Sequence, residues 1–232
     1  MEEKSRAGCA RQNGDSMFNG FSPETMDFLW GIRMNNERSW FLAHKNAYTQ
    51  FLYEPMKALG NEIFQPFQSV PGLELKVSRI YRDARMHPAT PYKESLWICI
   101  RRHVTVWSQH PALFFELRPE GASYGFLLWQ PRPDAMERFR QDLSANPHGF
   151  PTLLETAQSR SGLTLSAACY KRAKPCPDPA LSPYFSWKGC LEAAVELPAG
   201  PELFSPSLAG QVRSALEAWL PISTYFYRFT DL

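Results

Sequence analysis

The chain has 232 residues, of which 44% are hydrophobic and 14% aromatic, a composition that fits a globular domain with a substantial core and excludes a disordered chain. Its formal net charge is only +2. The charge of the whole chain therefore gives no reason to expect nucleic acid or an acidic membrane as a partner.

The first residues of the chain are small, polar or charged, and they lack the apolar stretch of a secretory signal. We therefore expect residues 1–17 to be a disordered extension and residues 18–232 to form a single domain. No stretch approaches the roughly 18 apolar residues of a membrane span. We expect a cytoplasmic protein without a membrane partner.

The next part of the chain shows helical periodicity. A first helix is predicted to begin at Ser22-Pro23, because serine suits the N-cap and proline the first helical position. Asn35-Asn36 is predicted to end it, and a second helix is expected from about Glu37 toward Tyr53. Apolar residues continue at helical spacing until Pro71-Gly72 closes this part.

The middle of the chain changes to the two-residue alternation of β-strands. The turns between the strands are short, which favours antiparallel pairing, because a parallel crossover needs a dozen or more residues. Helices and short strands follow, so we predict an α+β fold with an antiparallel central sheet covered by helices. The expected strands are 75–85, 96–106, 112–117, 124–129, 163–170 and 191–197, and the later helices are 134–143, 152–160 and 207–220.

The densest polar feature is Arg79-Ile80-Tyr81-Arg82-Asp83-Ala84-Arg85, followed by Pro91-Tyr92-Lys93. On one strand, Arg79, Tyr81, Asp83 and Arg85 point to one face, whereas Arg82 points to the other with Ile80. Arginine side chains bind carboxylate or phosphate through two parallel hydrogen bonds. The pattern predicts a pocket for a small anionic ligand bound by Arg79, Arg85, Tyr92 and Lys93. Asp83 or His87 would transfer protons if the pocket is an enzyme site.

Several sequence blocks follow one another in a recognisable order. They are Asn35-Asn36-Glu37-Arg38-Ser39-Trp40-Phe41, then Tyr48 and Pro55, then 78–85, then Pro91-Tyr92-Lys93, then Tyr124-Gly125 through Trp129-Gln130-Pro131, then Lys171-Arg172 and Pro221 to Phe229. Together these blocks resemble the family catalogued as domain of unknown function 2461 (DUF2461). The resemblance covers about Phe18 to the C-terminus and implies no activity. The chain differs from the family at 86–90, where the family usually has a lysine-containing loop, and at 126–128, where the family has glycines.

Other site classes have less support. The five cysteines contain no C-x-x-C pair and the five histidines are dispersed, so we expect reduced thiols and no metal. Neither the phosphate-binding G-x-x-x-x-G-K-[ST] nor the dinucleotide-binding G-x-G-x-x-G occurs, so no cofactor is predicted.

Two alternatives to the anion pocket stay open. The basic sheet face could bind nucleic acid or a protein, which requires Arg79, Arg101 or Arg102 to be exposed beside a ring such as Tyr81 or Trp107. The chain could also be a scaffold without a ligand, because alternating basic residues are often only the solvated face of a strand.

Arg82, Trp40 and Tyr48 are assigned structural roles around the predicted pocket. Arg82 shares the inner face with Ile80, so its charge must be paired. We expect Arg82→Ala to cost several kcal/mol, the usual penalty for breaking a buried ion pair. Arg79→Ala and Arg85→Ala should leave stability nearly unchanged and remove anion binding.

Overall fold

The computed structural model describes residues 17–83, 85–172 and 174–231. The predicted extension 1–17 therefore lies outside the described residues, apart from Met17.

Six strands form one antiparallel sheet in the order β1-β2-β3-β4-β6-β5. The sheet and its covering helices confirm the predicted α+β fold. The strands are β1 Leu73–Val77, β2 Leu96–Arg102, β3 Ala112–Arg118, β4 Gly121–Leu128, β5 Ser166–Cys169 and β6 Trp187–Pro198. The helices are α1 Pro23–Met34, α2 Arg38–Ala43, α3 Lys45–Ala47, α4 Glu54–Phe64, α5 Pro133–Ala145, α6 Gly149–Ser161, α7 Ser182–Phe185 and α8 Leu208–Thr230. Shorter turns are the π-helix η1 Tyr48–Tyr53 and the 3₁₀ turns η2 Gln65–Phe67, η3 Trp107–Gln109 and η4 Pro179–Leu181.

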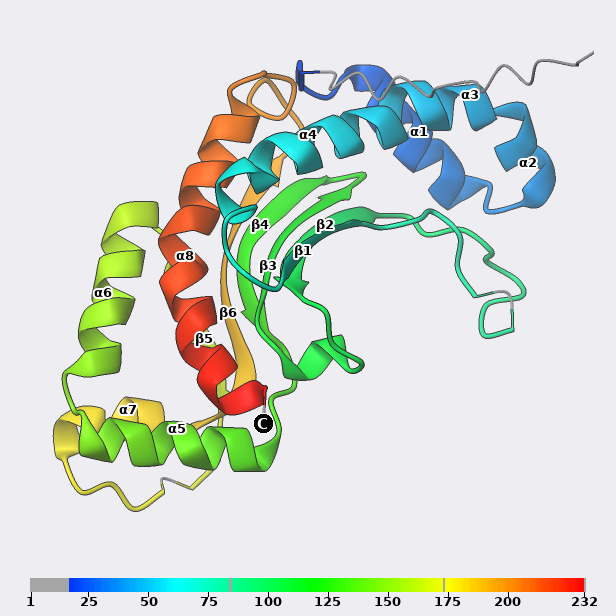
Figure 1. Cartoon of the computed structure of the whole chain (residues 1–232). Helices are drawn as coiled ribbons and strands as arrows, with labels where there is room; N and C mark the ends of the chain where they lie inside the picture. The colour runs from blue at the N-terminus through cyan, green and yellow to red at the C-terminus, as the bar shows by residue number, and fades with distance from the viewer. Residues whose placement is uncertain (1–16, 84, 173, 232) are drawn as a thin grey trace, which may run out of the picture.

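The core lies between one face of the sheet and the helices α4 and α8, which run along the curved sheet (Figure 1). Alternation along the strands places Ile98 and Phe126 on this face, where both are fully buried. Phe126 stacks on Trp219 of α8 at 5.5 Å between ring centroids. The opposite face carries Trp97 and Phe114, which stay partly exposed. We call it the open face.

The predicted strand 75–85 is wrong beyond Val77. Ser78 still donates its amide to the carbonyl of Trp97 at 2.8 Å, and Lys93 donates to the carbonyl of Ile80 at 2.7 Å. These two hydrogen bonds are two residues apart on the first segment, at Ser78 and Ile80. They are four residues apart on the segment that pairs with it, at Trp97 and Lys93. This mismatch interrupts the regular ladder, as a bulge does. Residues 78–95 consequently leave the sheet as a projecting segment (Figure 1).

Several further elements differ from their predicted bounds, and three differences are large enough to describe. The strand expected over 96–106 ends at Arg102. The second helix is divided into α2, α3 and the π-turn η1, because the hydrogen-bond spacing changes at Tyr48. The last helix, expected over 207–220, continues through Pro221 to Thr230.

Candidate functional site

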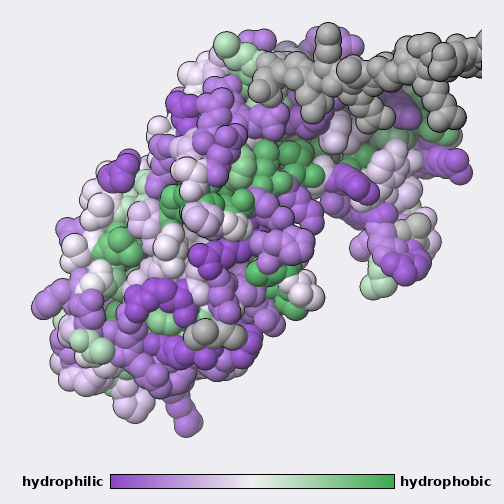
Figure 2. Space-filling view, in the orientation of Figure 1, coloured by the Kyte–Doolittle hydropathy of each residue, from purple (hydrophilic) through white to green (hydrophobic). Residues whose placement is uncertain are grey.

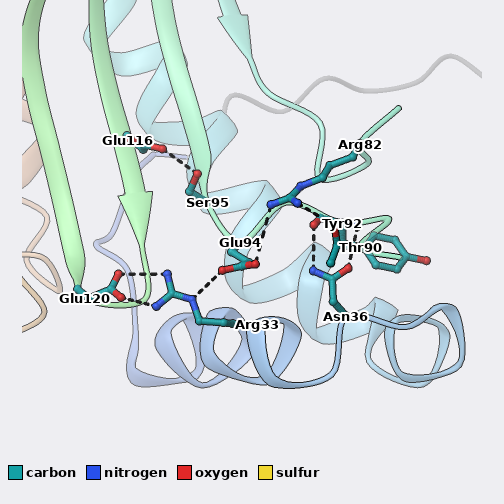
Figure 3. Close-up of polar contacts among 9 residues, drawn as sticks. All are labelled: Arg33, Asn36, Arg82, Thr90, Tyr92, Glu94, Ser95, Glu116 and Glu120. Atoms are coloured by element: carbon teal, nitrogen blue, oxygen red, sulfur yellow. Dashed lines mark hydrogen bonds and ion pairs between the residues drawn. The ribbon is translucent and has the colours of Figure 1, made fainter. Parts of the chain in front are cut away.

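The projecting segment is anchored to the N-terminal helices through Asn36. The side-chain amide of Asn36 donates to the carbonyl of Tyr92 at 3.0 Å, and the amide of Tyr92 donates to Asn36 Oδ1 at 2.9 Å (Figure 3). The Tyr92 ring stacks on Phe41 of α2 with 4.4 Å between centroids and is only 4% exposed. Tyr92, predicted to bind a ligand, thus lies within the packing that holds the segment.

Trp40 and Tyr48 lie in the same aromatic cluster. Trp40 stacks on His44 at 4.0 Å and contacts Phe28 at 5.6 Å. Tyr48, at the start of the π-turn, packs against Phe41 at 5.5 Å. Burial raises the pKa of the Tyr48 hydroxyl, which is hydrogen-bonded to the backbone of Ile80. Tyr48 therefore contacts the base of the projecting segment directly, whereas Trp40 packs within the N-terminal helices.

Arg82 belongs to a chain of ion pairs that joins the segment to α1 (Figure 3). Its guanidinium lies 3.9 Å from Glu94 and donates to the Thr90 hydroxyl at 3.0 Å. Glu94 also accepts a hydrogen bond from Arg33 Nε at 2.9 Å, and Arg33 pairs with Glu120 in the β3–β4 turn. Arg82 is thus paired with a carboxylate, although its side chain is 26% exposed.

Asp83 and Arg85 bind each other at the far end of the segment. Arg85 donates from Nε and Nη2 to the two Asp83 oxygens at 3.0 and 2.6 Å, and its side chain is 88% exposed. The hydrogen bond from Arg85 lowers the pKa of Asp83, which weakens this carboxylate as a general base. His87 is exposed nearby and Arg79 is exposed nearer the sheet. Among the described contacts, none joins Arg79 and Arg85 to Lys93.

Lys93 lies on the open face beside Trp97. Its ammonium is 5.5 Å from the centre of the Trp97 ring. Burial, followed by the positive charges of Lys76 and Arg82, lowers the pKa of Lys93. Within the described part of the chain, no carboxylate lies within 4.0 Å of its ammonium. Glu116, which is paired with Trp97 in the sheet register, instead accepts a hydrogen bond from Ser95 at 2.7 Å.

Lys76, whose positive charge acts on Lys93, also lines a surface hollow of about 360 Å³ at the far end of β1 and β2. Arg101 and Glu74 face each other across these strands at 3.8 Å, and Glu74 also contacts His103 at 3.1 Å. Trp107 is 52% exposed at the rim. We call Lys76, Lys93, Trp97 and this hollow the open-face site. Figure 2 shows the surface hollowed between the body of the molecule and the projecting segment.

A comparison with models of protein families identifies the family of this chain. The family model described as a conserved hypothetical protein (DUF2461) matches residues 24–225. The chain belongs to this family. No curated protein matches the chain.

The blocks that carry the family resemblance come together in the structure. Asn36, Phe41 and Tyr48 of the N-terminal DUF2461 blocks surround Tyr92 and Ile80 of the later blocks. These five residues of the family blocks therefore meet at one structural junction. Lys93, at its edge, is partly exposed beside Trp97.

Sequence reasoning did not single out Lys76 or Trp97 as site residues. The usable signal was strand alternation: Lys76 pairs with Cys99, and Trp97 lies two residues before Cys99 on the same face. The structure describes no group of three or more histidine, cysteine, aspartate or glutamate side chains that could hold a metal. Among the same residues, no helix is long and apolar enough to cross a membrane.

Proposed function

We propose that the protein binds a small anionic ligand, carrying phosphate or carboxylate, at the open-face site. Lys93 and Lys76 supply the positive charge, and Trp97 supplies an apolar ring surface beside them. The proposal keeps the Pro-Tyr-Lys lysine of the sequence-based prediction and replaces Arg79 and Arg85 with Lys76.

The observation that carries the proposal is the uncompensated charge of Lys93. A partly buried ammonium loses hydration, and most such groups are paired with a carboxylate. The charged groups that influence Lys93 are instead the cations Lys76 and Arg82. An anion between the two lysines would relieve both the lost hydration and the repulsion.

Trp97 suggests that the ligand also has a flat or apolar part. Its ring already contacts the Lys93 ammonium at 5.5 Å, and tryptophan is the best aromatic surface for a cation. A ligand with a ring next to its anionic group can use the remaining exposed surface of Trp97. We therefore expect an aromatic phosphate to bind more tightly than phosphate alone.

A nucleic-acid interface receives less support than the anion site. Arg101 is 7% exposed and faces Glu74, while Arg102 pairs with Asp231 and stacks over Tyr227 at 4.4 Å. Their charges are therefore already compensated within the protein. Of the three arginines considered for such an interface, Arg79 alone is exposed, and the Tyr81 ring two residues further along is exposed as well.

Isothermal titration calorimetry with inorganic phosphate and phenyl phosphate tests the proposal. Lys93→Gln and Lys76→Gln should each weaken phenyl phosphate binding by about tenfold, because each removes one charge-assisted contact. Lys45→Gln is the matched control, since Lys45 is an exposed lysine on α3 away from the open face. It makes the same change in net charge and should leave the affinity unchanged.

Two results would count against the proposal. If neither probe binds at low salt, the proposed anion site is refuted, because contacts to phosphate are strongest at low ionic strength. An equal loss of affinity in Lys93→Gln, Lys76→Gln and Lys45→Gln would mean that the probes respond to the net charge of the protein and not to the open-face site. Salt-dependent binding of a single-stranded oligonucleotide that is lost in Arg79→Gln would favour the nucleic-acid alternative.

A further inference from the structure

A second hollow, separate from the open-face site, lies between the C-terminal part of α4 and the N-terminal part of α8. Its volume is about 460 Å³, within the range of small-molecule sites. Glu62 and Arg213 line it from the two helices, and Ala58 and Phe64 form an apolar part of the wall. Figure 1 shows these ends of α4 and α8 next to each other. We call it the α4–α8 hollow.

Glu62 has an unmet need for a hydrogen-bond donor. Its Oε2 atom is buried, and no donor lies within hydrogen-bonding distance of that atom in the described structure. Leaving a buried acceptor without a donor costs about 1–3 kcal/mol, and more for a charged group. Natural proteins contain few such groups, and a partner supplied from outside the chain is one way to satisfy them.

Arg213 supplies a charge opposite to that of Glu62 in the same hollow. It lines the same hollow, is partly buried, and forms no hydrogen bond or ion pair among the described contacts. It does not reach Glu62, because no ion pair within 4.0 Å joins them. The hollow thus holds one acid and one base on opposing helices, each without a partner.

Three amide side chains add hydrogen-bonding capacity to this wall. Asn61, Gln65 and Gln68 line the hollow, and their side chains make no hydrogen bonds within the described residues. Each amide can both donate and accept. The wall therefore offers a negative group, a positive group and neutral polar groups around one space.

From this arrangement we propose that the α4–α8 hollow binds a small zwitterion of the α-amino-acid class. The ligand ammonium pairs with the Glu62 carboxylate, whose charge is shared by both oxygens. The ligand carboxylate pairs with the Arg213 guanidinium, a geometry that arginine forms through two parallel hydrogen bonds. The amides of Gln65 and Gln68 contact the ligand side chain, which rests against Phe64.

The test uses the full chain and the twenty free L-amino acids. A thermal-shift screen at millimolar concentration should find amino acids that raise the melting temperature, because a ligand that binds only the folded state stabilises it. Calorimetry then gives the dissociation constant of the best one. Its N-acetyl derivative, which lacks the ammonium, and its methyl ester, which lacks the carboxylate, should each bind at least about tenfold more weakly.

Variants locate the binding. Glu62→Gln and Arg213→Gln should each weaken the best amino acid by at least about tenfold, whereas Arg213→Lys should recover part of the loss because it restores the charge. Glu155→Gln, the same exchange at an exposed position of α6, should change the affinity less than twofold. Melting curves without ligand confirm that the variants fold.

Two outcomes would overturn the proposal. One is that no amino acid raises the melting temperature of the full chain, which would mean that only water fills the hollow. The other is binding that Glu62→Gln and Arg213→Gln do not weaken. Phenyl phosphate binding should be the same in these variants as in the original protein, so this site and the open-face site fail or succeed independently.

Discussion

Replacing Glu94 with glutamine tests the ion-pair chain that joins the projecting segment to α1. Glu94 is shared by two guanidinium groups, Arg33 at 2.9 Å and Arg82 at 3.9 Å. The exposed fraction of the side chain is 29% for Arg33, 26% for Arg82 and 35% for Glu94. The attraction of one pair at such a distance is about 4 kcal/mol at an effective dielectric constant of 20, but desolvation and side-chain entropy cancel most of it.

We expect Glu94→Gln to lower the free energy of unfolding by about 2 kcal/mol, between the values for exposed and for buried pairs. Arg82→Ala should cost about 1 kcal/mol, because Glu94 keeps Arg33 as a partner and Arg82 is partly hydrated. The sequence alone suggested several kcal/mol for Arg82→Ala, which assumed a fully buried pair. The observed exposure reduces that value.

Urea unfolding and thermal melts measure these differences, since 1 kcal/mol shifts the melting temperature by about 2–4 °C in a chain of this size. Asp83→Asn is the matched control: it also removes a carboxylate from an arginine pair, but at a site where Arg85 is 88% exposed, so its shift should be near zero. The reasoning is refuted if Arg82→Ala costs more than Glu94→Gln, or if Asp83→Asn costs as much as Glu94→Gln.

Gly125→Ala should destabilise the sheet by about 3 kcal/mol in thermal melts, because a Cβ there would lie 1.9 Å from a carbonyl oxygen of β6; Gly210→Ala, in open space on α8, should be neutral or stabilising. Asn36→Ala should cost about 2 kcal/mol through its two lost hydrogen bonds and should weaken phenyl phosphate binding in calorimetry, since it loosens the segment that carries the lysine. Burial raises the pKa of Cys99 to about 12, so at pH 8 a thiol reagent should label the exposed Cys169 at once and Cys99 only after unfolding; rapid labelling of Cys99 would contradict its burial.

The fold could be predicted from local pattern because its strands alternate strongly and are connected by short turns. Ile98 and Ile100 alternate with Trp97 and Cys99, and this pattern fixes which face of β2 meets the helices. The end of β1 could not be predicted in the same way. Alternation continues through Ser78 and Ile80, which are buried, while the hydrogen-bond ladder is interrupted by extra residues in the partner chain.

The candidate site was only partly predictable for a related reason. Strand parity separated Arg82 from Arg79 and Arg85, and the structure puts Arg82 beside Glu94 while Arg85 binds Asp83. Parity says nothing about partners that are distant in sequence. Arg33, on α1, contacts Glu94 across 61 positions of the chain, and no local pattern indicates that contact.

The arrangement of the DUF2461 blocks suggests why they occur together. Asn36 and Phe41 can hold Tyr92 only if the segment after β1 returns to α2, so the two blocks depend on each other for packing. Lys93 follows Tyr92 directly, and its position over Trp97 depends on that anchor. The packing of Asn36 and Phe41 against Tyr92 therefore determines where the partly buried ammonium of Lys93 lies. Under the proposed anion site, the blocks contribute to ligand binding by placing Lys93 over Trp97. The exposed Arg79 and Arg85 then do not need to contact the ligand.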